Sequence, residues 1–329
     1  MNTPLAQQLH TEGLLSEASL EKVKAAEAGR LFSVHWELKT LLYLGVLLLS
    51  GGLGVLVYKN IDTIGHQAVL AFIAVVSAGC FYYCIKKKPP FSTARVASPG
   101  VLYDYLLLLA CLTFVSFLGY WQYQYGIFGQ RYGLALFVPM VVLFFTAYYF
   151  DHLGVLSLAI TNLAAWAGIA VTPLQLWREN DFDNPVLIST GLALGLFLLV
   201  AAFFSEKQKI KTHFAFTYTN FGMNLLFVAG LAGMFYYDHY YLLWFLVLAV
   251  IAARFYFEAL RQRSFYLLLM TSLYSYIALG YTVGRLVLSM PGADLGAVIL
   301  LCMYFILSAS GLIVFLVRTN KKMKNHDSI

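Results

Sequence analysis

The chain alternates between long apolar runs and short polar segments that hold most of its charge. A helix needs roughly 20 residues to cross the hydrocarbon core of a bilayer, which is about 30 Å thick. The strands of a membrane barrel would instead alternate in polarity over about 10 residues, and the apolar runs here are continuous. We therefore predict an all-α membrane protein, a bundle of about ten transmembrane helices at residues 40–58, 68–85, 101–120, 133–150, 154–172, 186–204, 213–236, 241–257, 265–283 and 296–317.

The composition supports lipid as the surroundings of these helices. Of the 329 residues, 60% are hydrophobic and 12% are charged, whereas soluble domains average about 45–50% and about 25%. Aromatic residues reach 16%, which suits rings that lie at headgroup level. The formal charge of +6 would indicate nucleic acid only as a basic patch on a soluble domain. The expected partner is the lipid bilayer, and no nucleic-acid partner is expected.

The distribution of Lys and Arg predicts the orientation, because cytoplasmic loops collect these residues. With the N-terminus inside, 17 of them fall on the cytoplasmic side and 4 on the other. Adding or removing one span would destroy this asymmetry, so an even number of spans is favoured. We expect a multi-pass protein of the bacterial inner membrane with both termini cytoplasmic. The cytoplasmic set is Lys22, Lys24, Arg30, Lys39, Lys86, Lys87, Lys88, Arg95, Lys207, Lys209, Lys211, Arg261, Arg263, Arg318, Lys321, Lys322 and Lys324.

Three regions follow from this pattern: a cytoplasmic helical leader at 1–39, the helix bundle at 40–317 and a basic cytoplasmic tail at 318–329. In the leader, Thr3 and Pro4 can start a first short helix and Gly13 can end it. Ser16 is a suitable N-cap for a second helix. The leader is thus predicted to be a helical hairpin, which either lies against the membrane or bundle or docks a protein partner.

The leader and the first span also resemble a known family. The leader contains Leu9, Gly13, Leu14, Leu15, Ser16 and Leu20, and the first span contains Gly45, Gly51, Gly52 and Gly54 before the exit Tyr58-Lys59-Asn60-Ile61-Asp62. Over about residues 5–65 this is similar to the DUF2157 family of bacterial polytopic membrane proteins. The resemblance implies a multi-span protein and carries over no catalytic residues.

Polar side chains recur on single faces of several predicted spans. Inside lipid such groups are costly and tend to face a bundle interior or a cavity. They either line a path for a small solute near the midplane, as in carriers, or bond neighbouring helices together. The path candidates are Asn162, Thr217, Asn220, Asn224, Thr271, Tyr274, Ser275, Thr282 and Arg285.

Few ionisable residues lie in or near the predicted spans. They are Asp104, Asp151, His152, Arg254 and Glu258, and all fall toward the predicted cytoplasmic side. Arg254 and Glu258 are one helical turn apart and can pair. Convergence of Asp104, Asp151 and His152 within hydrogen-bonding distance would favour an enzyme, whereas wide separation would rule it out.

Metal and cofactor signatures are weak in this sequence. Cys80 and Cys84 are one turn apart without a neighbouring His or further Cys, so apolar packing is favoured over a metal site. The chain has no GxSxG elbow, HExxH, P-loop or GxGxxG. We predict no metal and no cofactor.

Three functions remain open at this stage. The first is a small-solute carrier with a polar cavity between helices. The second is a non-transporting scaffold or sensor that docks a partner through residues 1–39. The third is an intramembrane enzyme acting on a lipid-linked substrate. An enzyme is the less favoured class, because the chain has no recognisable catalytic motif.

Overall fold

The computed structural model describes five segments of the chain and three isolated positions, and every regular element in them is a helix. The chain divides into two compact units, Met1–Val69 and Leu70–Ile329. The described residues are 9–28, 41, 48, 55, 65–129, 131–171, 184–289 and 295–325.

In the first unit, the described part of the leader contains the helix α2, Glu17–Ala28. The chain turns before it at Gly13, whose φ of +72° suits a glycine. Ser16 caps α2 as predicted, since its Oγ accepts the N–H of Ser19 at 3.3 Å. Thr3, Pro4 and nearly all of the predicted first span, 40–58, lie outside the described residues.

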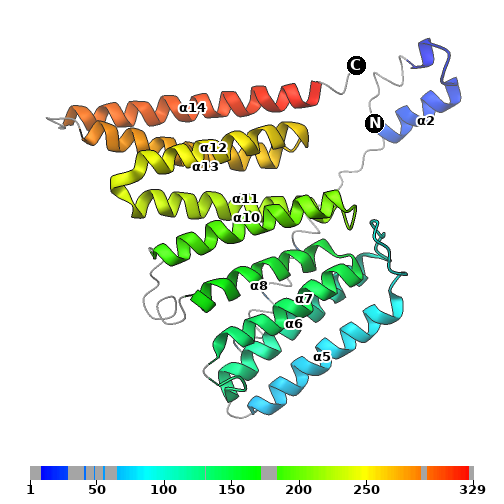
Figure 1. Ribbon diagram of the computed structural model, residues 1–329. Helices are drawn as coiled ribbons and strands as arrows, with labels where there is room; N and C mark the ends of the chain where they lie inside the picture. Colours follow the sequence, from blue (N-terminus) through cyan, green and yellow to red (C-terminus); the bar gives the residue numbers. More distant parts are fainter. Residues whose placement is uncertain are drawn as a thin grey trace. The chain divides into compact units, whose positions relative to one another are not determined.

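The second unit holds the helices of the bundle (Figure 1). In the described residues, eight helices are long and apolar enough to cross a membrane, and α8 has a shorter apolar part, Leu153–Gly168. The predicted class, an all-α membrane protein, is confirmed, and each predicted span from 68–85 onward coincides with one helix. The helices are α5 (His66–Lys87), α6 (Val101–Tyr125), α7 (Tyr132–Phe150), α8 (Leu153–Val171), α10 (Pro185–Lys207), α11 (Phe214–Tyr236), α12 (Tyr241–Arg261), α13 (Phe265–Leu288) and α14 (Leu295–Asn325).

Two apolar cores lie side by side in this unit, and α11 contributes to both. Leu107, Leu156 and Phe214 are buried in the first core, which joins α5, α6, α7, α8, α10 and α11. Phe227 and Leu267 are buried in the second core, which joins α11 to α12, α13 and the end of α14. Of the apolar stretch of α11, 61% is buried, so this helix is an interior element that positions the helices around it.

α10 and α11 approach each other closely at glycines. A Cβ placed on Gly195 would lie 2.8 Å from Cγ of Leu226 and 3.1 Å from the carbonyl oxygen of Gly222. A Cβ on Gly191 would lie 3.0 Å from that of Ala229. Gly191 and Gly195, four residues apart on α10, therefore permit tight packing of two helix backbones.

One end of the second unit carries most of its basic loop residues and is called the basic end below. Here α5, α7, α10 and α12 end and α6, α8, α11 and α13 begin. The N–H of Lys211 bonds to the carbonyl of Thr93 at 2.8 Å, and Arg261 lies 3.8 Å from Glu206. These contacts bring together segments far apart in the sequence. α14 continues to Asn325, so the first part of the predicted tail is helical.

The glycine contact gives a first prediction. Gly195→Ala should destabilise the folded protein by about 1–3 kcal/mol, because the new methyl group meets a backbone oxygen that cannot move aside. Gly119→Ala on α6 is the matched control, since a Cβ there meets nothing within 4 Å. The control should stabilise by up to about 1 kcal/mol through helix propensity. Thermal denaturation of the purified proteins measures both, and equal effects would contradict the close approach.

Candidate functional site

The turn between α7 and α8 holds a buried carboxylate. Asp151 ends α7 with φ 58° and ψ 48°, a left-handed conformation that Asp and Asn tolerate better than most residues. Its side chain is only 4% exposed. The carboxylate accepts the N–H of Val96 at 2.6 Å, which ties the segment between α5 and α6 to this turn.

Two cationic or titratable side chains complete the environment of Asp151. Lys211 Nζ lies 3.1 Å from Oδ2, and the lysine side chain is 1% exposed. His213 Nε2 lies 2.7 Å from Oδ1. Lys211 Nζ also donates to the carbonyl of Ala94 at 3.4 Å. A buried charge is costly unless it is paired and hydrogen-bonded, and here the carboxylate has three donors.

His213 keeps one ring nitrogen without a partner. Its Nδ1 is buried and makes no hydrogen bond, while Nε2 contacts Asp151. With the proton on Nε2, the carboxylate fixes the orientation of the ring, and Nδ1 is left as an enclosed acceptor without a partner. A histidine oriented in this way by a carboxylate is the arrangement of a general base.

His152, next in the chain, has a different environment. Its Nδ1 accepts the N–H of Val155 at 3.1 Å, which caps the start of α8, so its proton lies on Nε2. Nε2 is 3.6 Å from Oδ1 of Asp104. That oxygen also accepts the hydroxyl of Ser98 at 2.6 Å. Burial lowers the pKa of His152, and the charges of Asp104 and Asp151 act in the opposite direction.

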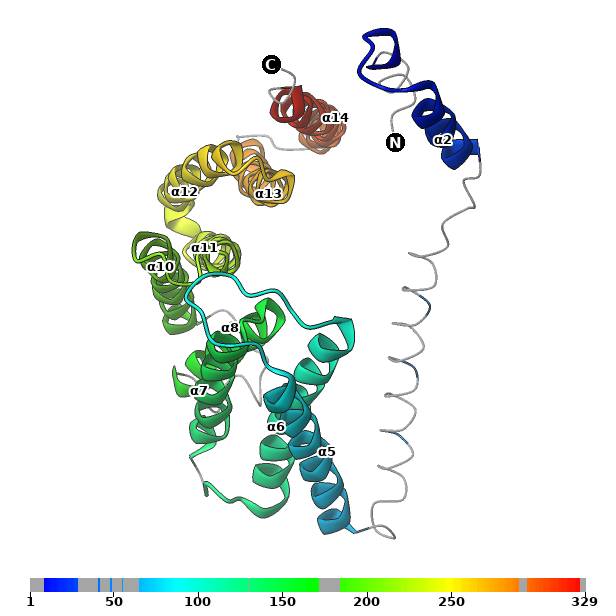
Figure 2. The same ribbon diagram turned by 90° about the vertical axis from the view of Figure 1, so that its right-hand side faces the viewer.

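These side chains surround a cavity of about 510 Å³, called the Asp151 pocket below. Figure 2 shows how the cyan segment between α5 and α6 extends over this end of the unit to the start of α11 before it returns to α6. The lining combines this segment, the α7–α8 turn and the start of α11. It includes Arg95, Ser98, Asp104, Asp151, His152 and His213.

The pocket is suited to proton transfer and polar binding. In the part of the chain that the structure describes, no group of three or more His, Cys, Asp and Glu side chains is placed to hold a metal ion. The ammonium group of Lys211 lies 3.1 Å from the Asp151 carboxylate, in the position that a metal ion bound to this carboxylate would take. The available chemistry is therefore that of an oriented histidine beside fixed charges.

Three of the sequence-predicted residues, Asp104, Asp151 and His152, line this pocket, with His152 Nε2 3.6 Å from Asp104 Oδ1, which is longer than a hydrogen bond. Lys211 and His213 were missed, because Lys211 was counted only as a basic loop residue and His213 as the start of a span. An even number of predicted spans separates Asp151 from Lys211 and His213, so all three lie at the same membrane surface. This count could have indicated that they are close together.

Arg254 and Glu258 lie elsewhere at the basic end. They form the predicted pair on α12, with 2.7 Å between Nη1 and Oε2. They line a separate cavity with residues of α10 and α11.

The predicted path residues mostly bond to each other or to their own helices. Tyr274 donates to Asn224 at 2.9 Å, and Asn224 donates to the side chain of Asn220 at 2.8 Å. Asn162 is buried and its Oδ1 has no partner. Three further candidates make hydrogen bonds: Thr271 to Met223, Ser275 to the carbonyl of Thr271, and Thr282 to the carbonyl of Ala278. Thr217 is buried.

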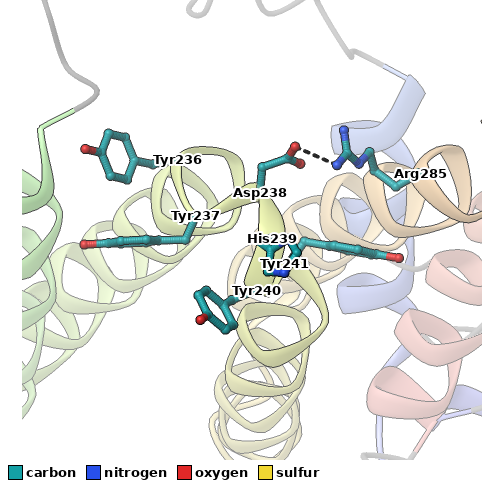
Figure 3. Close-up of a pocket in the computed structure, with 7 residues that line it drawn as sticks. All are labelled: Tyr236, Tyr237, Asp238, His239, Tyr240, Tyr241 and Arg285. Atoms are coloured by element: carbon teal, nitrogen blue, oxygen red, sulfur yellow. Dashed lines mark hydrogen bonds and ion pairs between the residues drawn. The ribbon is translucent and has the colours of Figure 1, made fainter. Parts of the chain in front are cut away.

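Arg285, the last of the path candidates, lies at the opposite end of the unit. It lines a cavity of about 610 Å³ formed largely by tyrosines. Figure 3 shows Arg285 and Asp238 pointing toward each other, at 2.6 Å. Tyr281 also donates to Asp238, at 2.9 Å. This group ties the turn before α12 to the end of α13, and it is separate from the Asn220–Asn224–Tyr274 cluster.

The buried pair gives a second prediction. Asp151→Asn keeps the size of the side chain and tolerates the left-handed backbone, but it leaves the Lys211 ammonium buried without an anion. Unfolding should become easier by about 3–5 kcal/mol. Adding Lys211→Met should restore part of the loss, because the uncompensated charge is removed. Denaturation of the single and double variants tests this, and a single variant as stable as the unsubstituted protein would refute the pairing.

The lowered pKa of His152 gives a third prediction. As the pH falls through about 6.5, the ordinary histidine value, the unfolded chain binds a proton before the folded chain does. This contribution to stability is therefore complete above that pH and is lost below it. His152→Asn keeps a side-chain acceptor at the start of α8 and should weaken the dependence of stability on pH. Thermal unfolding from about pH 8 to about pH 5 measures it, and an identical slope in both proteins would contradict it.

Comparison with known proteins gives one family match. The model of DUF2157, described as a predicted membrane protein, matches residues 7–156, which extends the resemblance noted at 5–65 and includes Asp104, Asp151 and His152. No curated protein and no solved structure matches the chain. Residues 7–156 thus identify the first part of this chain as a match to the DUF2157 family of predicted membrane proteins.

Proposed function

We propose that the protein is a membrane enzyme that binds the polar head of a lipid-linked substrate in the Asp151 pocket. The observation that carries this proposal is the state of His213. Its Nε2 is held by the Asp151 carboxylate at 2.7 Å, and its Nδ1 has no partner. His213 acts as the general base: Nδ1 takes the proton of a substrate hydroxyl or amine, and the charge of Asp151 stabilises the protonated ring.

The size and the position of the pocket support this substrate class. A volume of about 510 Å³ falls in the usual range for small-molecule sites, about 300–1,000 Å³. The pocket lies where α7 ends and α8 and α11 begin, so its ligand enters at the level of the lipid headgroups. The excess of Lys and Arg predicts that this end faces the cytoplasm, with both termini on the same side.

A small-solute carrier is the second candidate. The buried Oδ1 of Asn162 has no partner, and an unsatisfied polar atom in a helix bundle is a place where a solute or water can bond. Against it, Asn220, Asn224 and Tyr274 bond to one another, which suits contacts between helices. The enzyme is therefore the better supported of the two.

The enzyme proposal predicts that His213→Gln strongly lowers turnover. The purified full-length protein, in nanodiscs of total bacterial lipid extract, should convert one lipid-linked species, followed by mass spectrometry. His213→Gln should lower the rate roughly 10²–10⁴-fold, the usual contribution of general acid–base catalysis. His239→Gln is the matched control, because His239 lines the tyrosine cavity at the other end, and it should convert at the unsubstituted rate.

Two outcomes would contradict the enzyme proposal. The first is conversion by His213→Gln at the rate of the control. The second is the absence of any lipid conversion together with solute uptake into proteoliposomes that Asn162→Ala abolishes, which would establish the carrier instead.

A further inference from the structure

A second ionic cluster lies at the basic end, on α12. The carboxylate of Glu258, whose side chain is 5% exposed, accepts from Arg254 Nη1 at 2.7 Å. Its other oxygen lies 2.8 Å from Arg261 Nη2 and accepts from Gln262 at 2.6 Å. This buried acid anchors two arginines on one face of the helix.

The two arginines reach outward from that anchor. Their side chains are 64% and 65% exposed, in contrast to the buried acid between them. A guanidinium has five N–H donors in a planar fork, and Glu258 engages one nitrogen of each arginine. The other N–H groups of Arg254 and Arg261 therefore remain as donors for a second anion. Because Glu258 holds both guanidinium groups in place, they are already oriented to bind it.

The cavity below the arginines has apolar walls. Its volume is about 310 Å³, and it lies between α10, α11 and α12. Leu199 and Phe203 form the α10 wall, and Phe255 forms the α12 wall. A ligand that fits must therefore carry a charged group at one end and a hydrocarbon chain at the other.

Two basic side chains, Arg254 and Arg261, and two acidic ones, Glu206 and Glu258, line the cavity. The arginines are its most exposed charged groups, at 64% and 65%, whereas Glu258 is 5% exposed. Glu258 is enclosed by its own donors. Glu206 is 47% exposed and lies 3.8 Å from Arg261, which makes it a partial competitor for that arginine.

We propose that this cavity, the Arg254–Arg261 site, binds an anionic phospholipid. The phosphate lies on the outward donors of Arg254 and Arg261, and one acyl chain lies against Leu199, Phe203 and Phe255. Basic pockets between transmembrane helices are known recognition sites for anionic headgroups. A zwitterionic lipid brings its own ammonium group, which competes for the phosphate, and free phosphate makes no use of the apolar walls. The site is distinct from the Asp151 pocket and does not depend on its function.

The test measures lipid binding by the purified full-length chain. Native mass spectrometry and thermal shift in detergent are recorded with phosphatidylglycerol, with phosphatidylcholine of the same chain length and with inorganic phosphate. Phosphatidylglycerol should bind at least tenfold more tightly than phosphatidylcholine, and phosphate alone should neither bind at comparable concentration nor stabilise.

Four variants locate the site. Arg254→Gln with Arg261→Gln should lose at least tenfold in phosphatidylglycerol affinity. Arg261→Gln alone should lose part of the phosphatidylglycerol affinity. In this variant Glu258 keeps Arg254 and Gln262 as donors, so it serves as the test if the double variant folds poorly. Glu206→Gln should bind more tightly, because the competing acid is gone. Arg318→Gln with Lys322→Gln on α14 removes the same charge away from the cavity and should bind as the unsubstituted protein does.

Three results would overturn the proposal. One is equal affinity for phosphatidylglycerol and phosphatidylcholine. Another is an equal loss in the α14 control and the double arginine variant, which would show a general charge effect. The third is stabilisation by inorganic phosphate equal to that by the lipid, which would show an anion site without a role for the apolar walls.

Discussion

The carboxylate of Asp151 joins three loop or turn segments above the apolar core that their helices share. It accepts from Val96 before α6, from Lys211 and His213 before α11, and it belongs to the turn between α7 and α8. Lipid offers no competing hydrogen bonds, so polar groups near the membrane must find partners within the protein. The shape of the Asp151 pocket follows from this one anion, because each of its walls is fixed by a bond to it.

The two ionic clusters of the basic end share a structural basis. Each places a buried carboxylate, Asp151 or Glu258, beneath basic side chains. They differ in what surrounds the acid. Lys211 is enclosed, so the Asp151 cluster is a fixed scaffold with one free ring nitrogen. Arg254 and Arg261 are largely exposed, so the Glu258 cluster presents its cations outward. The first arrangement is suited to chemistry and the second to recognition at the membrane surface.

The helices could be predicted from the sequence because span length and apolar character are local properties. Nine of the ten predicted spans coincide with described helices, eight of which are long and apolar enough to cross a membrane, and nearly all of span 40–58 lies outside the described residues. Partners of single charges could not be predicted in the same way. Lys211 follows α10 among other basic residues, and Lys209 shares its left-handed backbone, with φ of 55° against 49°. Lys211 is set apart by long-range contacts with Thr93 and Asp151. Likewise, the spacing of polar residues along a helix does not distinguish side chains that line a cavity from side chains that bond two helices together. The hydrogen bond between Asn224 and Tyr274 places these two residues in the second group.

The length of α14 has a mechanical consequence. Its 31 residues make a rod of about 46 Å at roughly 1.5 Å per residue, whereas the hydrocarbon core measures about 30 Å. The excess falls on the last turns, which carry Arg318, Lys321 and Lys322. Long cationic side chains keep their heads in the aqueous interface, so this end resists being drawn into the bilayer. The last turns of α14 therefore extend past the hydrocarbon core as a charged helical segment, and the hydroxyl contact between Tyr276 and Ser308 joins the apolar part of this helix to α13.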